Sequence, residues 1–170
     1  MARVYLGLGS NIERERYIVA GLDALEQRFG PLALSPVYDC PAVGFVGQPF
    51  LNMVVGIDTG LDVGDLAREL RHIEVEHGRA PDAPRFAARQ LDIDILTYAD
   101  LCGVVDGVEL PRGELLENDF VLRPMAELAP AATHPVLGRA YADLWAHFHG
   151  ARFARRVTFQ WRGREVSRAE

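Results

Sequence analysis

Asp92 and Asp94 stand two residues apart in an alternating stretch, Leu-Asp-Ile-Asp-Ile, at residues 91–95. In a β-strand, residues two apart share one face of the sheet and lie about 6.6 Å from each other. A strand here would point both carboxylates to one side and the apolar side chains to the core. Two neighbouring carboxylates repel each other unless a cation lies between them, and Mg²⁺ combines carboxylate, phosphate and water oxygens. The spacing therefore indicates a cation site, or else a half-buried strand with a solvated acidic face.

Three arginines, Arg79, Arg85 and Arg89, lie in the loop directly before this strand. A guanidinium presents a planar fork of N–H donors that fits phosphate oxygens in pairs. Acids and arginines that meet at one end of a strand are typical of metal-assisted phosphoryl-type transfer, in which the protein mainly positions groups and neutralises charge. Salt bridges from these arginines to the many nearby acids are the structural alternative.

A second group of residues suits a flat ligand. Phe50 and Asn52 begin a predicted strand, and Phe120 begins the segment after a polar loop at 110–119. Two aromatic rings can sandwich a heterocycle, while an asparagine offers both a donor and an acceptor to the edge of the ligand. Burial of the two rings in the core is the alternative interpretation.

Hydrophobic periodicity predicts the elements that position these residues. Strands are expected at residues 4–8, 32–38, 50–57 and 91–98. The glycine-rich segment 7–11 lacks the Gly-Lys-Ser/Thr ending of a Walker motif and is expected to form a tight turn and a helix cap. A capping box of Ser10 and Glu13 would open a first helix, which ends at Gly30. Asp62 would cap a second helix, which ends at Gly78.

The remaining chain adds four predicted features: a short hairpin near 104–105, a helix after 120, an amphipathic stripe over 141–148 and a strand at 157–161. The first strands and helices thus follow in the order βαββαβ. This order is the ferredoxin-like pattern, an α+β fold in which helices pack on an antiparallel sheet. Because that fold hosts many activities, the fold alone does not decide the function.

Length and composition fit one globular domain. The chain has 170 residues, of which 49% are hydrophobic and 25% charged. A chain of this length buries about 70% of its unfolded surface, so it needs no disulfide or structural metal to fold. Its two cysteines, Cys40 and Cys102, fit no CxxC pattern. No apolar run approaches the roughly 18 residues of a membrane span, and the N-terminus lacks the apolar centre of a signal peptide. We therefore expect a cytoplasmic protein that does not bind a membrane.

The charge is unevenly divided along the chain. All 18 basic residues are arginine, which excludes a P-loop lysine and a Schiff-base lysine. Residues 1–150 hold 12 arginines against 22 acids, whereas residues 151–170 hold 6 arginines against 2 acids. The acidic body argues against nucleic acid as a partner. We therefore divide the chain into a domain at 1–150 and a basic C-terminal extension at 151–170, which we expect to be a solvated strand or a frayed end.

Six segments carry a resemblance to a known family. They are Tyr-Leu-Gly-Leu-Gly-Ser-Asn (5–11), Ser-Pro-Val-Tyr-Asp-Cys-Pro (35–41), Gln-Pro-Phe-Leu-Asn (48–52), Glu-Val-Glu-His-Gly-Arg (74–79), Arg-Gln-Leu-Asp-Ile-Asp-Ile-Leu (89–96) and Phe-Val-Leu-Arg-Pro-Met-Ala-Glu-Leu-Ala-Pro (120–130). In this order, over roughly residues 2–148, the sequence resembles 6-hydroxymethyl-7,8-dihydropterin pyrophosphokinases of the folate pathway. That family transfers pyrophosphate from ATP to the hydroxymethyl group of a reduced pterin and releases AMP.

The resemblance implies a role for each matching position on the phosphate side. Asp92 and Asp94 would be the ligands of two Mg²⁺ ions that bridge the phosphates of the co-substrate ATP. Arg79 and Arg89 would grip those phosphates and stabilise the transferring group. Five further positions match the nucleotide side of the family's site: Glu74, Arg85, Phe86, Ile95 and Arg112.

The resemblance also implies a pterin side and a set of partners. Phe50 and Phe120 would stack the pterin, and Asn52 would bind its pyrimidinone edge, helped by backbone groups around Cys40 and Val43. Pterin and ATP are the expected ligands, and the protein is expected to be a monomer or a weak dimer. Dihydropteroate synthase, a second folate enzyme, is the expected functional neighbour.

The chain departs from the family pattern on the ATP side. Residues 86–89 read Phe-Ala-Ala-Arg where the family has Trp-Gly-Pro-Arg. In the 111–118 stretch Arg112 takes the place of a histidine, while Glu114 and Asn118 take the places of two arginines. Fewer cations around the triphosphate would weaken ATP binding or slow transfer. Two alternatives therefore stay open: a divergent paralogue that acts on another pterin-like alcohol or uses another nucleotide, and a non-catalytic pterin-binding protein with a weakened ATP site.

Overall fold

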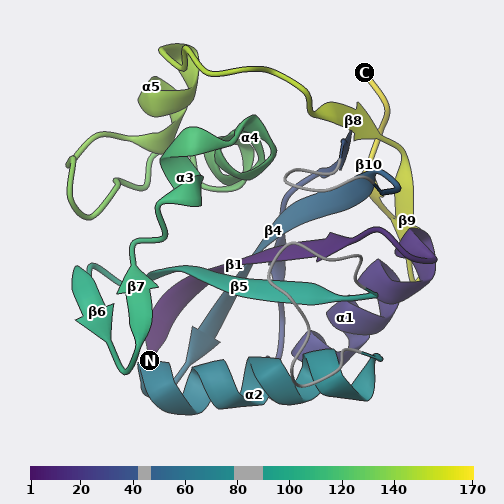
Figure 1. Ribbon diagram of the computed structural model, residues 1–170, viewed down its shortest axis with the longest axis horizontal. Helices are drawn as coiled ribbons and strands as arrows, with labels where there is room; N and C mark the ends of the chain where they lie inside the picture. Colours follow the sequence, from purple (N-terminus) through teal and green to yellow (C-terminus); the bar gives the residue numbers. More distant parts are fainter. Residues whose placement is uncertain (42–46, 79–89) are drawn as a thin grey trace.

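The computed structural model describes residues 1–41, 47–78 and 90–170. Within these ranges the main sheet has six strands: β1 (Ala2–Ser10), β2 (Ala33–Leu34), β3 (Val37–Cys40), β4 (Phe50–Thr59), β5 (Asp92–Tyr98) and β8 (Arg155–Val157). Their order is β5-β1-β4-β3-β8, with β2 also paired to β4, and every pairing is antiparallel (Figure 1). The predicted ferredoxin-like α+β fold is therefore confirmed.

Two long helices, α1 (Arg14–Phe29) and α2 (Val63–Glu76), cover one face of this sheet (Figure 1). Their apolar residues recur every three or four positions, and the side chains of Leu22, Leu25, Leu66 and Ile73 are fully buried. They pack against alternate residues of β1, β4 and β5 in one core cluster. Asp62 caps α2 as predicted, because its carboxylate accepts a hydrogen bond from the Asp65 amide at 2.8 Å.

The start of α1 differs from the prediction. Strand β1 continues through Ser10, which pairs with Leu51 of β4 and is fully buried. The Ser10 hydroxyl donates to the carbonyl of Ile12, and the helix begins only after Glu13, whose φ of 41° lies in the left-handed region. The side chain of Glu13, the N-cap residue, makes no capping hydrogen bond. The predicted capping box is therefore wrong, because sheet pairing holds Ser10 in the strand.

The predicted strand at 32–38 is divided in two. Pro36 has no backbone N–H to donate, and the chain leaves β2 before it and enters β3 after it. The hydroxyl of Ser35 accepts a hydrogen bond from the Val54 amide at 2.8 Å, which keeps the interruption attached to β4.

Three shorter helices pack on the opposite face of the sheet: α3 (Glu114–Glu117), α4 (Asp119–Leu128) and α5 (Tyr141–Ala146) (Figure 1). Their buried residues form a second cluster with Val54 of β4 and Leu96 of β5. Asn52 and Asp94, two residues before these positions on the same face, are only half-buried and lie outside the cluster. The helices thus cover part of the second face and leave the end that carries Asn52 and Asp94 accessible.

A hairpin of β6 (Gly103–Val105) and β7 (Val108–Leu110) forms a separate two-stranded sheet, which confirms the hairpin predicted near 104–105. No helix in the described part of the chain is long and apolar enough to cross a membrane.

The basic extension at 151–170 is packed, which contradicts the expectation of a solvated strand or a frayed end. Strand β8 joins the main sheet beside β3, and β9 (Phe159–Trp161) and β10 (Arg164–Ser167) form a hairpin. The predicted strand at 157–161 is thus divided between β8 and β9. Phe159 and Trp161 are 5% and 4% exposed in the core cluster under α1, so apolar burial holds the segment in place.

Candidate active site

The two aspartates lie side by side at the accessible end of β5. Ile93 and Ile95 point into the core, so Asp92 and Asp94 point to the opposite face, as predicted. On the neighbouring strand β1 the residues opposite them are glycines: Gly9 pairs with Asp92 and Gly7 with Asp94. On the other side of β1, Gly9 pairs with Asn52 of β4. No β1 side chain therefore separates the carboxylates of β5 from the amide of Asn52.

Asp94 is in an environment that disfavours its charge. Burial and the neighbouring charge of Asp92 raise the pKa of Asp94 to about 8, while Arg112 acts in the opposite direction. Arg112 Nη2 lies 3.8 Å from Asp94 Oδ1, and the same nitrogen donates to Glu114 Oε1 at 3.2 Å. The backbone N–H of Arg112 donates to the carbonyl of Leu96 at 2.8 Å, which fixes Arg112 beside β5. The structure thus brings Asp92, Asp94 and Arg112 together.

Glu74 and Ile95 were both predicted on the nucleotide side: Glu74 contacts β5 from α2, whereas Ile95 is part of β5. Glu74 on α2 is 4% exposed, and its carboxylate accepts a hydrogen bond from the Ile93 amide at 2.8 Å. Since β5 is an edge strand, this bond holds the outer edge of the strand between the two aspartates. The side chain of Ile95 is in the core, and its backbone groups point to that same outer edge as those of Ile93. Any nucleotide contact of Ile95 would come from its backbone.

Cys40, Phe50 and Asn52, which were predicted on the pterin side, meet on one face of β3 and β4. Cys40 pairs with Phe50, and the Nδ2 group of Asn52 donates to the thiol of Cys40. A Cβ on Gly9 would lie 2.8 Å from Asn52 Oδ1 and 3.5 Å from Phe50 Cδ1, so the missing side chain leaves room for both. Phe120, in the first turn of α4, packs against the second core cluster on the same face of the sheet.

Five predicted site residues lie outside the described residues: Val43, Arg79, Arg85, Phe86 and Arg89. Their roles stay predictions from the sequence.

Two features of the site were missed at the level of sequence. Gly7 and Gly9 belong to β1 rather than to a turn. They lie between the aspartates of β5 and Asn52 of β4, and leave the sheet surface there free of β1 side chains. Glu114 shares Arg112 with Asp94. The spacing of the glycines, two residues apart as in the aspartate pair, is the signal that could have placed them on one strand face.

The two cysteines are expected to differ sharply in reactivity. Cys40 is 2% exposed, and its burial raises the pKa of the thiol to about 12, whereas Cys102 is exposed. The thiolate is the reactive form, so iodoacetamide at pH 8 should modify Cys102 and leave Cys40 intact until the protein is unfolded. Peptide mass spectrometry reads both sites. Alkylation of Cys40 in the native protein at the rate of Cys102 would contradict the buried placement.

Comparison with known proteins finds one family over most of the chain. The model of the 7,8-dihydro-6-hydroxymethylpterin-pyrophosphokinase (HPPK) family matches residues 5–130. A 2-amino-4-hydroxy-6-hydroxymethyldihydropteridine pyrophosphokinase of Aquifex aeolicus is 36% identical, over 80% of this chain and 86% of its own. A relative of the same name from Pseudomonas aeruginosa is 39% identical, over 85% and 90%. The chain belongs to the HPPK family. It is a pyrophosphokinase of folate biosynthesis, and the resemblance predicted from its motifs is confirmed.

Solved structures of HPPK-DHPS proteins share the fold. The wild-type protein of Plasmodium falciparum with pteroate superposes with a TM-score of 0.75 over 98% of this chain, at 12% identity. At that identity the likeness shows the fold alone. The chain spans 47% of the length of that protein.

Proposed function

We propose that this HPPK-family chain transfers pyrophosphate from ATP to the hydroxymethyl group of 6-hydroxymethyl-7,8-dihydropterin, with Mg²⁺ as cofactor and AMP as the second product. The observation that carries the proposal is the arrangement across β1. The carboxylates of Asp92 and Asp94 lie on one side of Gly7 and Gly9, and the amide of Asn52 lies on the other. One side suits a metal–triphosphate group, and the other suits the edge of a heterocycle.

The carboxylate pair fits two divalent cations. The raised pKa of Asp94 reports unfavourable negative charge, which a cation would offset. No cluster of three or more histidine, cysteine or acidic side chains that could hold a metal occurs in the described ranges. Asp92 and Asp94 would therefore share the ions with phosphate and water oxygens, a ligand set that Mg²⁺ prefers. Bound there, Mg²⁺ would neutralise the triphosphate and polarise the phosphate under attack.

The side chains on the other side of β1 would orient the pterin. Because the thiol of Cys40 accepts from Asn52 Nδ2, the amide of Asn52 has a fixed direction. Its oxygen can then accept from the pyrimidinone edge of the pterin. Phe50 on β4 and Phe120 on α4 would supply the two stacking rings.

With both ligands in place, the transfer is a single displacement without a covalent intermediate. The hydroxymethyl oxygen attacks the β-phosphorus of ATP and releases its proton to water, and the bond from that phosphorus to the oxygen of AMP breaks. The chain contributes mainly position and charge. Arg112 beside Asp94 adds a positive charge on the phosphate side, and the sequence predicts that Arg79 and Arg89 add two more.

One observation favours a second candidate, a pterin-binding protein with a weakened ATP site. Glu114 accepts a hydrogen bond from Arg112, so part of the positive charge near Asp94 is already neutralised. A divergent paralogue that acts on another pterin-like alcohol has no such observation in its favour and is a matter for substrate profiling.

The solved structures named HPPK-DHPS join the names of the two enzymes in one protein. This supports a functional link to dihydropteroate synthase. We propose that enzyme as the functional neighbour. A cytoplasmic location and a monomeric or weakly dimeric state stay predictions of the sequence.

Separation of the nucleotides after incubation with ATP, Mg²⁺ and 6-hydroxymethyl-7,8-dihydropterin tests the proposal. AMP should form only when both the pterin and Mg²⁺ are present, EDTA should stop it, and added Mg²⁺ should restore it. ADP in place of AMP would mean transfer of a single phosphoryl group. Pterin binding without turnover of ATP would favour the second candidate.

A further inference from the structure

The C-terminal segment 151–170, here called the strap, joins the sheet next to the pterin side of the candidate site. Its strand β8 pairs with β3, with Val157 opposite Val37 and Arg156 opposite Tyr38. Strand β3 ends at Cys40, the residue whose thiol holds the amide of Asn52. The strap is therefore attached to the sheet wall of the site.

The strap is also attached to the helix that carries the opposite wall. Asp119 is the first residue of α4, directly before Phe120, and is 1% exposed. One oxygen of its carboxylate accepts hydrogen bonds from the amides of Phe153 and Ala154, both at 2.7 Å. Hydrogen bonds to a buried charged acceptor are among the strong ones. Asp119 thus ties the first turn of α4 to the strap.

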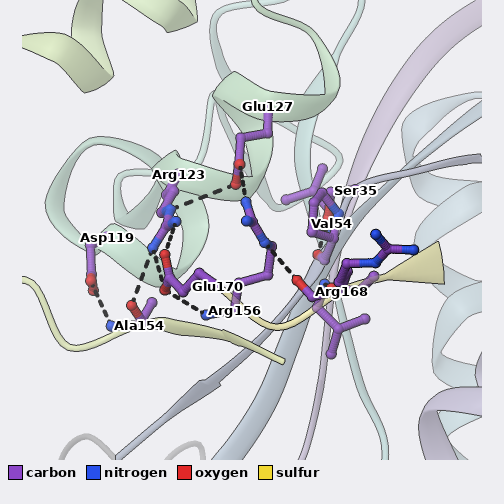
Figure 2. A network of polar contacts seen from close by, with 12 residues as sticks. Ser35, Val54, Asp119, Arg123, Glu127, Ala154, Arg156, Arg168 and Glu170 are labelled. Carbon is purple, nitrogen blue, oxygen red and sulfur yellow. Dashed lines mark hydrogen bonds and ion pairs between the residues drawn. The ribbon is translucent and has the colours of Figure 1, made fainter. Parts of the chain in front are cut away.

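A network of alternating charges makes a second attachment along α4 (Figure 2). Arg123 and Glu127 belong to α4, whereas Arg156 and Glu170 belong to the strap. Arg123 Nη2 lies 2.8 Å from Glu170 Oε2, and Arg156 Nη1 lies 3.3 Å from Glu127 Oε2. The backbone amide of Arg156 also donates to Glu170 at 3.0 Å. Each charged side chain of the network is therefore paired with an oppositely charged side chain of the other element.

The same network reaches the sheet wall. The guanidinium of Arg123 lies 4.8 Å from the ring centroid of Tyr38, at cation–π distance. Tyr38 is fully buried and pairs with Asn52 across the β3–β4 ladder. One arginine of α4 is thus in contact with both the strap and the strand beside Asn52.

We propose that the strap is a clamp that fixes α4, and with it Phe120, against the sheet wall formed by Cys40, Phe50 and Asn52. Asp119 is its positioning residue. This inference rests on the proposed function, because it assigns the clamp to pterin binding. The strap lies beyond residues 5–130, the range that the family model matches.

The test compares Asp119→Ala with Asp23→Ala. Asp23 on α1 accepts from the indole N–H of Trp161 at 2.9 Å and pairs with Arg162, so it holds the β9–β10 hairpin in the middle of the strap, away from α4. Asp119→Ala should weaken pterin binding by about tenfold or more, because small displacements of a positioned ring are costly. The KM for ATP, and kcat at saturating pterin, should stay within about twofold of wild type. Asp23→Ala should lower Tm without moving the Kd of the pterin.

Asp119→Asn serves as the conservative variant. Both strap amides bond to one carboxylate oxygen, which an amide oxygen can replace, so this variant should recover most of the pterin affinity. Equal pterin affinity in Asp119→Ala and wild type would overturn the clamp. Equal weakening by Asp119→Ala and Asp23→Ala would also overturn it, since general loosening would then be the cause.

Hydrogen exchange of the free protein separates this inference from the proposed function. Asp119→Ala should speed exchange at the first turn of α4 more than Asp23→Ala does, whether or not the pterin binds. A wild-type protein that binds no pterin would sink the proposed function, and with it the assignment of the clamp to pterin. Unchanged exchange at α4 would remove the clamp alone. If Asp119→Ala does not fold, Arg156→Gln cuts the tie to Glu127 and is measured in the same way.

Discussion

Asp94→Asn is expected to lower the rate of pyrophosphoryl transfer by about a thousandfold or more, because in the proposed mechanism it removes a charge that would hold the Mg²⁺ ions. The same substitution is expected to make the protein more stable in the absence of Mg²⁺. An amide keeps the shape of the carboxyl group and carries no charge. The variant should therefore lose its activity without losing its fold.

The gain in stability follows from the pKa of Asp94. Burial and the charge of Asp92 raise it from 3.8 to about 8, so the folded protein holds a proton that the unfolded chain releases. The contribution of this group to stability is complete below about pH 4 and is lost as the pH rises toward 8. Asp94→Asn should thus match wild type near pH 4 and exceed it at pH 8. With the side chain 29% exposed, we expect a gain of about 1–2 kcal/mol, or roughly 3–6 °C in Tm.

Calorimetry in EDTA at several pH values measures this effect, and Asp58→Asn is the matched control. Asp58 is an exposed residue of β4 paired with Arg3, so its substitution should change stability by less than about 1 kcal/mol. An Asp94→Asn protein no more stable than wild type at pH 8 would contradict the unfavourable burial and charge repulsion that we assign to the Asp94 carboxylate. Full activity of the variant would contradict the proposed role of Asp94 as a metal ligand.

Gly9→Ala is expected to raise the KM for the pterin by roughly ten- to a hundredfold with a smaller effect on kcat. Its Cβ would lie 2.8 Å from Asn52 Oδ1, closer than van der Waals contact allows. The end of a flexible side chain can move away at little cost in stability, but the moved amide no longer faces the ligand in the same direction. Steady-state kinetics with the pterin and with ATP varied separately would show the change in one KM only.

Gly56→Ala is the control for this substitution. Its Cβ would lie 2.8 Å from the guanidinium of Arg3, again the end of a flexible side chain, but outside the candidate site. It also meets Tyr5 and Ala33 at 3.1 and 3.2 Å, so we expect a loss of stability and an unchanged KM for the pterin. If Gly9→Ala behaved like Gly56→Ala, the position of Asn52 would not matter for pterin binding.

Patterns among residues close in sequence predicted much of the fold and the two aspartates at the centre of the site. Alternation in 91–95 predicted the direction of Asp92 and Asp94, and helical spacing predicted α1 and α2. These predictions succeed because each depends on residues that are close in sequence. The capping box failed for the opposite reason: pairing with Leu51, far along the chain, keeps Ser10 in β1.

The strap is a stronger example of a structure that depends on contacts between residues far apart in the sequence. Its charge suggested a solvated segment, yet Trp161 is buried under α1 and bonds to Asp23, 138 residues away. Arg123 and Glu170, which form its closest ion pair with α4, are 47 residues apart. A pattern search over a short stretch of sequence never includes both partners of such a contact. The contact is therefore seen only in the folded chain.

The mass of the pterin product tests the central claim most directly. The purified protein is incubated with ATP, Mg²⁺ and 6-hydroxymethyl-7,8-dihydropterin, and the pterin is recovered for mass spectrometry. We predict a pterin that has gained two phosphoryl groups, with AMP in equal amount. A pterin that has gained one phosphoryl group, or an unchanged pterin that the protein nevertheless binds, would contradict pyrophosphoryl transfer.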